Sequence, residues 1–417
     1  MRSMTITNRL CVTLVGLLVG CRADSEPRVA SAGSSNVRPA VPAAAPAAAP
    51  CAKDVRGAPR TLVLEARCSP YTIAATGTFV VGELTIEPGV ELRVPPGVGV
   101  NVETKLVAKG TADRPIRISS AGLWGSLQLR GGSASILEHV RIDDAGYGGL
   151  GIGVLVHDGA LVEMRDVHVE TGSKPAREEL ARLAARGDAH ARFVAVQVQR
   201  ADPRSRIEAV WTESYSTSLL FTDAGTLPIF GLTRGISLVE VVGGVLETDY
   251  TLPKDPRYLF GRVEVRGSGG KRPTLSIEAG TTIEFHPAGS LAIRDARLVA
   301  RGTESRGVRL QPRGAHSAAA DEIGTLAWGG LYFVDDTAGS VLEHVTLVAA
   351  ATATPGRSSI AVNENSELTL DHVVFLDLSS DAKATPAITR DCRATVTIKA
   401  GIQVSMRRRL LEDTCAQ

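Results

Sequence analysis

The sequence predicts an all-β fold, a right-handed parallel β-helix solenoid with an internal duplication, preceded by an N-terminal signal and a disordered tether. Three observations lead to this prediction. From about residue 60 onward, short runs rich in Val and Ile are separated by Gly, Pro, Asp and Ser turns, which is typical of strands. Four sequence blocks occur twice in the same order. Aromatic residues make up only 4% of the chain, too few for a typical β-sandwich or WD-type propeller.

The duplication is the most specific of these observations. The offset between paired blocks grows from 191 residues at Leu84 and Leu275 to 205 at Ser135 and Ser340. The pairs are Leu84–Val94 with Leu275–Phe285, Leu106–Ile118 with Leu298–Leu310, Trp124–Leu129 with Trp328–Phe333, and Ser135–Ile142 with Ser340–Leu347. Each block is too small to bury a face alone. We therefore expect the blocks to stack in coils of about 20–25 residues, roughly a dozen in all, around one apolar core.

These blocks resemble exported bacterial right-handed parallel β-helix proteins, the pectin-lyase-like superfamily. The phrases that carry the resemblance are LTIEPGVELRV, LVAKGTADRPIRI, WGSLQL and SILEHVRI with their second copies. The resemblance covers about residues 70–170 and 240–376, the two repeat halves. Four glycines of the blocks are expected where a turn needs a positive φ or a close approach of backbones: Gly89, Gly110, Gly280 and Gly302.

The first twenty residues have the features of an export signal. Arg2 and Arg9 precede the apolar run Leu10–Gly20, which is too short to span a bilayer, since a spanning helix needs about 20 residues. The run ends in LVGC, which resembles a bacterial lipobox and implies that Cys21 is acylated and anchored in a lipid bilayer. Arg22 takes the place of an inner-membrane retention Asp, so we expect an outer-membrane lipoprotein. The alternative is an ordinary secretory signal with a chance cysteine.

The rest of the chain divides by composition. Residues 21–50 are rich in Pro and Ala and lack any apolar period, which predicts a disordered tether. The β-helix is expected over residues 51–417, with a C-terminal cap at about 380–417. One segment, at about 174–187, has the features of a helix and is interpreted as a solvated excursion or as a flap over a groove.

Four cysteines remain after Cys11 and Cys21 are set aside: Cys51, Cys68, Cys392 and Cys415. An even number in an oxidising compartment favours disulfides, and four cysteines allow three connectivities. They cluster at the two ends of the folded region, so we favour the local pairs Cys51–Cys68 and Cys392–Cys415. A zinc site is the weaker alternative, because no Cys-x-x-Cys spacing occurs.

Charge argues against nucleic acid as a partner. The chain has 46 Lys and Arg against 45 Asp and Glu and no sustained basic stripe, whereas nucleic-acid affinity comes mostly from neutralising phosphates. No motif for a cofactor or a metal ion was found. The sequence therefore predicts neither.

The resemblance raises three catalytic possibilities, namely sugar-acid elimination with calcium, glycoside hydrolysis by several Asp, and ester hydrolysis. The acid pairs Asp143-Asp144 and Asp335-Asp336 do not occupy equivalent repeat positions, and such pairs usually form turns. His139 and His344, like Trp124 and Trp328, recur in both halves and are better explained by packing of the repeat. We therefore expect no catalytic residues.

Residues without counterparts in the second half are the better candidates for binding. They are Arg141, Asp143, Asp144, Tyr147, His157 and Asp158, which lie less than one coil apart and suit hydrogen bonding to a glycan. Ordinary loop polarity is the alternative. The sequence thus predicts an envelope-anchored lipoprotein with a non-catalytic β-helix that presents a binding surface for a polysaccharide or an envelope protein. The second hypothesis is a polysaccharide lyase or hydrolase on the same scaffold.

Overall fold

The structure is a computed structural model in which the chain forms two units, Met1–Pro50 and Cys51–Gln417. It describes residues 51–417 except 148–150, 172–193, 212–216, 232–235, 316–327, 349–357, 377–385, 405–408 and 415–417. The expected signal, Cys21, the tether and the helical segment at 174–187 lie outside the described residues. Among those residues, no helix is both long and apolar enough to cross a membrane.

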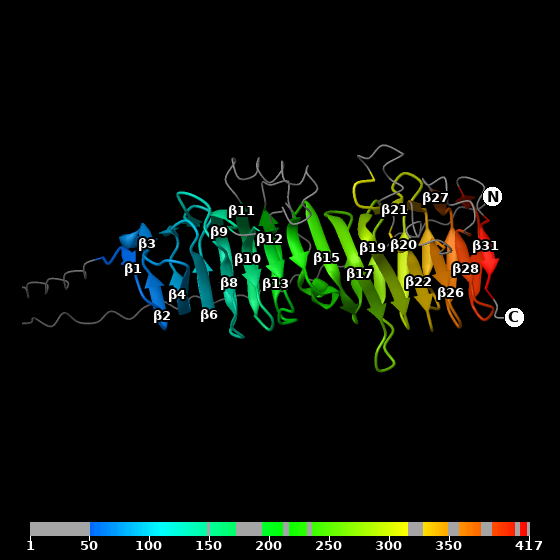
Figure 1. Ribbon diagram of the computed structural model, residues 1–417, viewed down its shortest axis with the longest axis horizontal. Coiled ribbons are helices and arrows are strands. Elements are labelled where there is room, and N and C mark those ends of the chain that lie inside the picture. Colours follow the sequence, from blue (N-terminus) through cyan, green and yellow to red (C-terminus); the bar gives the residue numbers. More distant parts are fainter. Residues whose placement is uncertain are drawn as a thin grey trace, which may run out of the picture. The chain divides into compact units, whose positions relative to one another are not determined.

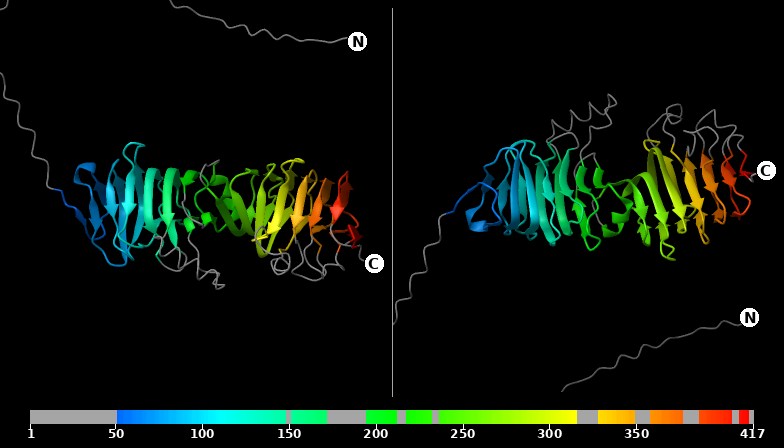
Figure 2. Two further views of the ribbon diagram at one scale, coloured as in Figure 1. Left: turned by 90° about the horizontal axis from the view of Figure 1, so that it is seen from above. Right: turned by 60° about the horizontal axis from the view of Figure 1, so that its bottom comes forward.

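The second unit is a stack of parallel strands that follow one another from β1 to β31 (Figures 1 and 2). One stack of paired strands, which we call ladder 1, passes through the whole unit. In the described residues it has thirteen strands: β4 (Thr78–Ile86), β6 (Gly99–Lys109), β8 (Leu127–Leu129), β10 (Ile152–Val156), β12 (Val194–Val198), β14 (Thr217–Phe221), β15 (Leu238–Leu246), β17 (Arg257–Arg266), β19 (Thr282–Arg294), β21 (Val308–Pro312), β24 (Val345–Val348), β27 (Val374–Leu376) and β30 (Gln403–Val404).

Two further ladders complete the coils of the first half. Ladder 2 contains β2 (Thr61–Leu64), β4, β6, β9 (Ser135–Ala145), β11 (Val162–Thr171) and β13 (Arg206–Trp211). Ladder 3 contains β1 (Asp54–Val55), β3 (Tyr71–Ile73), β5 (Glu91–Arg93), β7 (Ile116–Ser119), β9, β11 and β13. Long strands such as β9 bend at a corner and so belong to two ladders.

The second half has its own two additional ladders. Ladder 4 contains β15, β17, β19, β22 (Leu331–Val334), β25 (Ile360–Val362), β28 (Ile388–Arg390) and β31 (Leu411–Asp413). Ladder 5 contains β16 (Tyr250–Leu252), β18 (Thr274–Ile277), β20 (Arg297–Arg301), β23 (Val341–Glu343), β26 (Glu367–Asp371) and β29 (Thr395–Ile398). The chain repeats the order 1, 2, 3 in the first half and 1, 4, 5 in the second. This is the coil of a parallel β-helix, as the sequence predicts.

The core is a column of apolar side chains, because alternate residues of each strand point inward. Most are aliphatic, but in the second half the buried rings of Phe260, Phe285 and Trp328 also pack on one another. In ladder 1 the inward positions pair in register from coil to coil and are almost completely buried. They are Val100, Leu127, Val154, Val196, Leu219 and Val239. Burial of each such side chain stabilises the fold by about 1.5–3 kcal/mol. The Val and Ile periodicity of the sequence therefore has its cause in this column.

The two halves meet at a joint after β14. Ladder 2 ends in a single bridge between Ile207 and Phe230, and the 3-10 helix η2 (Ala224–Ile229) packs on β15 where ladder 4 begins. Gly244 has φ +101°, and a Cβ there would lie 2.3 Å from Asp223 Oδ1, so the contact requires glycine. Across the joint, only ladder 1 continues by strand pairing in the described residues, through three residue pairs of β14 and β15.

Because of the joint, each block of the second copy lies one ladder further around the coil than its equivalent in the first copy. Leu127 lies in ladder 1, and its equivalent Leu331 lies in ladder 4. Val140 lies in ladder 3, whereas its equivalent Val345 lies in ladder 1. Each block thus moves to the next face of the coil. Equivalent strands of the two halves consequently do not belong to the same continuous ladder.

Residues that recur in both halves hold the coil together. Trp124 and Trp328 are both completely buried, and their Nε1 atoms donate to the backbone oxygens of Asp143 at 2.7 Å and Val348 at 2.8 Å. Asp143 and Val348 are themselves equivalent positions. The tryptophans are thus packing residues, in agreement with the interpretation of the sequence.

The repeated histidines occupy equivalent corners of the coil. His139 and His344 both have φ +48°, a conformation that few side chains adopt. In both halves the backbone of this corner packs closely against a glycine. A Cβ at Gly110 would lie 2.6 Å from the carbonyl oxygen of His139, and a Cβ at Gly302 would lie 2.6 Å from that of His344. These two glycines are therefore needed for close approach. Gly89 and Gly280, with φ of +84° and +89°, are needed for their turns.

A disulfide between Cys51 and Cys68 closes the N-terminal end of the unit, as expected. It joins the first described residue to the 3-10 helix η1 (Ala66–Cys68). At the other end, Cys392 is also disulfide-bonded, while its expected partner Cys415 lies outside the described residues. The N-terminal local pair is thus confirmed.

Candidate functional site

The outer surface of ladder 3 carries the densest group of charged residues among the candidates. In β7 and β9, the inward residues are Ile116, Ile118 and Ile142, so the residues between them point outward. We call this outer row the ladder 3 surface. Its charged and titratable members are Glu91 and Arg93 in β5, Arg117 in β7, Arg141 and Asp143 in β9, and His168 and Glu170 in β11, where His168 is in register with Arg141.

The centre of the ladder 3 surface is one carboxylate held by two guanidinium groups. Arg117 Nε donates to Asp143 Oδ2 at 2.7 Å, and Arg141 Nε donates to Asp143 Oδ1 at 2.8 Å. Asp143 is only 4% exposed, whereas the two arginine side chains are about half exposed. We call these three residues the arginine clamp. The buried carboxylate fixes the direction of both guanidinium groups, as charge-assisted hydrogen bonds do.

Two further acids lie beside the arginine clamp. In the coil before it, Arg93 Nε donates to Glu91 Oε1 at 2.9 Å. In the coil after it, Glu170 Oε2 lies 3.5 Å from Arg141 Nη2. In register along the stack, Glu91 is followed by Arg117, Arg141 and His168, and all these side chains stand on strands of a rigid sheet. Sites on strands are held more precisely than sites on loops.

A shallow depression borders the clamp at the corner where ladder 3 turns into ladder 1. Its lining is mostly apolar, because two prolines and small residues occupy the corner. The residues that line it are Thr72, Glu91, Arg93, Val94, Pro95, Pro96, Ser119, Ser120 and Ala121. A concave surface with an apolar floor and a few polar groups at its edge is a common form of ligand site.

Tyr147 stands at the same corner. It is 65% exposed, and its backbone N–H donates to the Trp124 carbonyl at 2.7 Å. A Cβ at Gly97 would lie 4.0 Å from Tyr147 Cε1, which places the ring over the turn that follows Pro95 and Pro96. Asp144 has φ +57°, and its carbonyl accepts from the Trp124 N–H at 3.1 Å. Buried Trp124 therefore positions both Asp143 and Tyr147.

The other two candidates lie elsewhere. His157 and Asp158 follow β10 at the corner between ladders 1 and 2, so the width of ladder 1 separates them from the arginine clamp. His157 Nε2 lies 3.2 Å from Gln128 Oε1, and Asp158 binds the backbone and side chain of Arg200. Burial, with a contribution from the Arg130 guanidinium, lowers the pKa of His157. The six candidates therefore form two groups.

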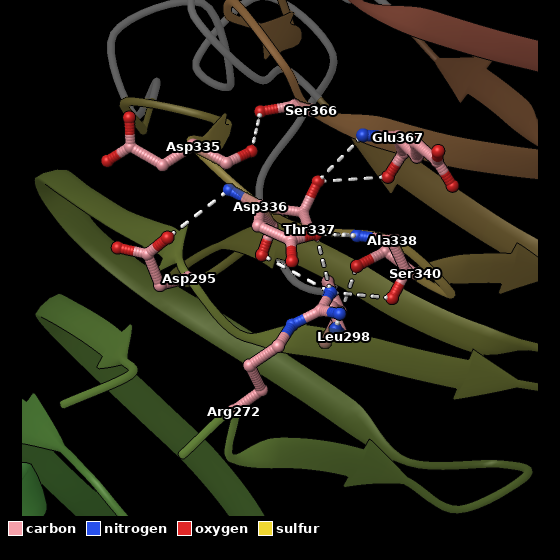
Figure 3. A network of polar contacts seen from close by, with 10 residues as sticks. All are labelled: Arg272, Asp295, Leu298, Asp335, Asp336, Thr337, Ala338, Ser340, Ser366 and Glu367. Atoms are coloured by element: carbon pink, nitrogen blue, oxygen red, sulfur yellow. Dashed lines mark hydrogen bonds and ion pairs between the residues drawn. The ribbon is translucent and has the colours of Figure 1, made fainter. Parts of the chain in front are cut away.

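The second acid pair, Asp335-Asp336, forms a turn between ladders 4 and 5 (Figure 3). Asp335 has φ +61°, and Asp336 Oδ1 accepts from the Ala338 N–H at 3.2 Å. Arg272 crosses the intervening coil and donates to the carbonyls of Asp336 and Ala338 at 3.3 and 2.9 Å (Figure 3). These contacts connect coils, in agreement with the interpretation of the pair as a turn former.

A second charged group lies on the outer face of ladder 1 in the second half. Glu240 and Glu284 point away from the core but are only 2% and 5% exposed. His286 Nε2 lies 3.0 Å from Glu240 Oε1, and Gln311 Nε2 donates to Glu284 Oε1 at 3.4 Å. Sequence inspection missed these residues, because a Glu in a strand is not distinctive. The two carboxylates are covered, whereas the side chains of His286 and of Arg257, which pairs with Glu284, are 27% and 52% exposed.

Sequence inspection also missed Arg117, Arg93, Glu91 and Glu170. A signal for Arg117 was present, since Ile116–Ile118 and Val140–Ile142 both have the form aliphatic-Arg-Ile. When such strands stack in register, their arginines are neighbours.

Among the described residues, no three His, Cys, Asp or Glu side chains are grouped so that they could hold a metal ion. Comparison with protein-family models, curated proteins and solved structures gives no match.

Proposed function

We propose that this protein is an envelope-anchored lipoprotein of the pectin-lyase-like superfamily, and that it binds a glycan on the ladder 3 surface without cleaving it. The observation that carries the proposal is the combination of the arginine clamp, the adjacent depression and the exposed Tyr147 on one side of a rigid stack of strands. The planar guanidinium and carboxylate groups donate and accept hydrogen bonds with sugar hydroxyls, and an exposed aromatic ring packs against the apolar face of a sugar.

Binding without cleavage is favoured by the state of Asp143. Both of its oxygens already accept hydrogen bonds from guanidinium groups, and its side chain is only 6% exposed. A general base or nucleophile must reach the reacting atom of the substrate. Asp143 therefore serves to hold the two arginines, which can themselves contact a ligand.

Glycan binding is tested with the full-length protein in detergent and a panel of polysaccharides from bacterial envelopes. We expect Tyr147→Ala to weaken binding at least tenfold, because the variant loses the only exposed aromatic ring among the residues whose side chains the structure describes. Val63→Ala is the matched control, since Val63 is 52% exposed but stands on ladder 2. Equal affinities for the two variants would contradict the proposal.

The runner-up activity is tested in the same preparation. Incubation with acidic polysaccharides and calcium should leave the polymers intact and should produce no absorbance from unsaturated uronates. Release of such products or of shorter chains would replace the binding proposal by a lyase or a hydrolase. An envelope protein captured at the ladder 3 surface in place of any glycan would likewise contradict it.

The anchor is tested separately by Cys21→Ser. The lipobox LVGC supports acylation of Cys21 and delivery to the outer membrane, with the tether of residues 21–50 between lipid and β-helix. We expect the variant to move from the membrane fraction to the soluble fraction. A variant that remains fully membrane-bound would refute the lipid assignment but would leave the glycan proposal open to its own test.

A further inference from the structure

We propose that the ligand of the ladder 3 surface is a glycan built from N-acylated acidic sugars, which carry a carboxylate and an N-acyl group on opposite sides of one ring. The inference rests on the proposed function and names its ligand class. Two neighbouring features carry it, namely the guanidinium group of Arg117 in the arginine clamp and the apolar depression that borders the clamp. Each feature fits one of the two substituents.

Arg117 supplies the hydrogen-bond donors for the carboxylate. Its side chain is 58% exposed, and its Nε donates to Asp143 Oδ2 at 2.7 Å. In the part of the chain that the structure describes, its Nη groups have no acceptor, so both are available to a ligand. A guanidinium group binds a carboxylate through two parallel hydrogen bonds, and because the direction of this one is already fixed, the entropic cost of binding is lower.

The guanidinium group of Arg117 is directed toward the depression. Arg117 is in register with Arg141, but it donates to Asp143, which lies two residues further along the next strand. Its guanidinium group therefore lies nearly level with Ser119, two residues further along β7, and Ser119 lines the depression. A sugar whose carboxylate is bound by Arg117 thus has its ring beside the depression.

The depression fits the N-acyl group. Its apolar lining consists of Val94, Pro95, Pro96 and Ala121. An acyl methyl group that lies against this lining is removed from water, which favours binding. Hydroxyl groups next to the apolar lining can accept from the amide N–H and donate to the amide oxygen. They belong to Thr72, Ser119 and Ser120.

The size and position of the depression indicate one substituted sugar. Its volume of about 460 Å³ is near the lower end of the range for small-molecule sites, roughly 300–1,000 Å³, so it takes a substituent of one sugar and no length of chain. Ala121 follows Ser119 by two residues, which span at most about 7 Å. The carboxylate and the N-acyl group are therefore expected across a single ring from each other, as in N-acetylneuraminic acid.

Charge alone does not select a ligand at the ladder 3 surface, because its arginines and acids are equal in number. They are Arg93, Arg117 and Arg141 against Glu91, Asp143 and Glu170. The remaining titratable member, His168, lies 3.4 Å from the carboxylate of Asp166. A uronate without an acyl group contacts Arg117 but leaves the depression in water, and a neutral N-acetylated sugar does the reverse. We therefore expect tight binding only when both substituents are present.

The test compares four hexasaccharides by isothermal titration with the full-length protein in detergent. A hexamer of α2,8-linked N-acetylneuraminic acid carries both substituents on every ring, oligogalacturonate carries only the carboxylate, chitohexaose carries only the N-acetyl group, and cellohexaose carries neither. We expect the wild-type protein to bind the N-acetylneuraminic acid hexamer at least tenfold more tightly than each of the other three. A smaller difference from oligogalacturonate or from chitohexaose would overturn the inference.

Substitution of Arg117 tests the carboxylate contact. Arg117→Gln should lower the affinity for the N-acetylneuraminic acid hexamer to the level of chitohexaose and leave chitohexaose binding unchanged. Arg117→Lys should recover only part of the loss, because an ammonium group lacks the planar pair of donors. Arg165→Gln is the matched control, since Arg165 is an ion-paired, half-exposed arginine on ladder 2. An equal loss in this control would contradict the assignment of Arg117.

Substitution of Ala121 tests the acyl contact. Ala121→Leu should lower the affinity for the N-acetylneuraminic acid hexamer to the level of oligogalacturonate, because the larger side chain fills the depression. Oligogalacturonate binding should not change. Ala112→Leu is the matched control, since Ala112 is also an exposed alanine but precedes β7, outside the depression. Unchanged binding of the N-acetylneuraminic acid hexamer by Ala121→Leu would refute the acyl contact.

The outcomes separate this inference from the proposed function. If all four hexasaccharides bind equally and Tyr147→Ala weakens them all, the surface binds glycans and the ligand class is refuted. If none of the four binds but another polysaccharide does, the ligand class is likewise refuted and the proposed function stands. If no glycan binds, both proposals fail. Circular dichroism checks that each variant is folded, as expected because Arg141 still holds Asp143 when Arg117 is replaced.

Discussion

The same strand pattern has different surroundings in the two halves. In the first half, Arg117 and Ser119 of β7 stand on the outside of ladder 3, where Arg117 is half exposed. The equivalent residues in the second half, Arg309 and Gln311 of β21, stand on the outside of ladder 1, where Gln311 is only 2% exposed. The repeat thus determines which residues point outward. The one-face rotation at the joint determines what those residues meet.

The side chain that pairs with the equivalent arginine differs between the two halves. In the first half, Arg117 is paired with Asp143, whose equivalent in the second half is the apolar Val348. In the second half, Arg309 Nε donates to the Gln311 side chain, which in turn donates to the buried Glu284. One copy therefore presents its guanidinium groups to solvent, while the other uses its polar residues within a covered network. The duplicated coils have thus diverged in their outer rows, while the equivalent core positions stay apolar.

Substitution of the repeated tryptophans is expected to give the largest loss of unfolding free energy. Replacement of either by Ala should cost about 3–5 kcal/mol of unfolding free energy. The Trp328→Ala substitution should cost about 1 kcal/mol more than Trp124→Ala. The ring centroids of Trp328 and Phe285 are 3.9 Å apart in a stacked arrangement, whereas the equivalent of Phe285 in the first half is Val94. Urea denaturation of the two variants measures the difference. A smaller loss for Trp328→Ala than for Trp124→Ala would show that the stacking adds nothing.

Independence of the two halves is the second expectation. Leu137 and Leu342 are equivalent and completely buried, so truncation of either to Ala should cost about 2–5 kcal/mol. Only ladder 1 crosses the joint by strand pairing in the described residues. Hydrogen exchange should therefore show lost protection mainly in the half that carries the substitution. Equal loss in both halves would mean that the joint transmits unfolding as well as any other coil.

A pH effect confined to the first half is the smallest expected difference. The pKa of His157 is lowered from 6.5 in the folded protein, mainly by burial. As the pH falls through the unfolded value, the unfolded chain takes up the proton first, so stability falls and the loss is complete below the folded pKa. His157→Gln should therefore reduce the decrease in stability between pH 7.5 and pH 5 in urea titrations. An unchanged decrease would exclude His157 as its source.

Much of the fold could be predicted from local sequence features. Alternating Val and Ile, paired with turn residues, indicate strands, and the two copies of the LEHV block indicate a repeated corner that contains His139 and His344. The rotation between copies could not be predicted. It depends on how many strands lie between the copies, and the segment that contains η2 and Phe230 follows neither repeat.

The candidate site was predictable only in part. Arg141, Asp143, Asp144 and Tyr147 do lie together, because the first three belong to the end of β9 and Tyr147 directly follows it. His157 and Asp158 do not join them, because β10 carries the chain across ladder 1 before it reaches these residues. Arg117 joins the site from the preceding coil through strand register. Register across coils depends on turn lengths, which residue type alone does not reveal.

The disulfide at the N-terminal end has a mechanical consequence. Cys51 is bonded to Cys68, and β1 and β2 lie within the loop that the bond closes. A tensile force that arrives through residue 50 passes across the sulfur atoms to η1 and bypasses the two strands. The disulfide thus shields β1 and β2 from being pulled off the stack one strand at a time by such a force.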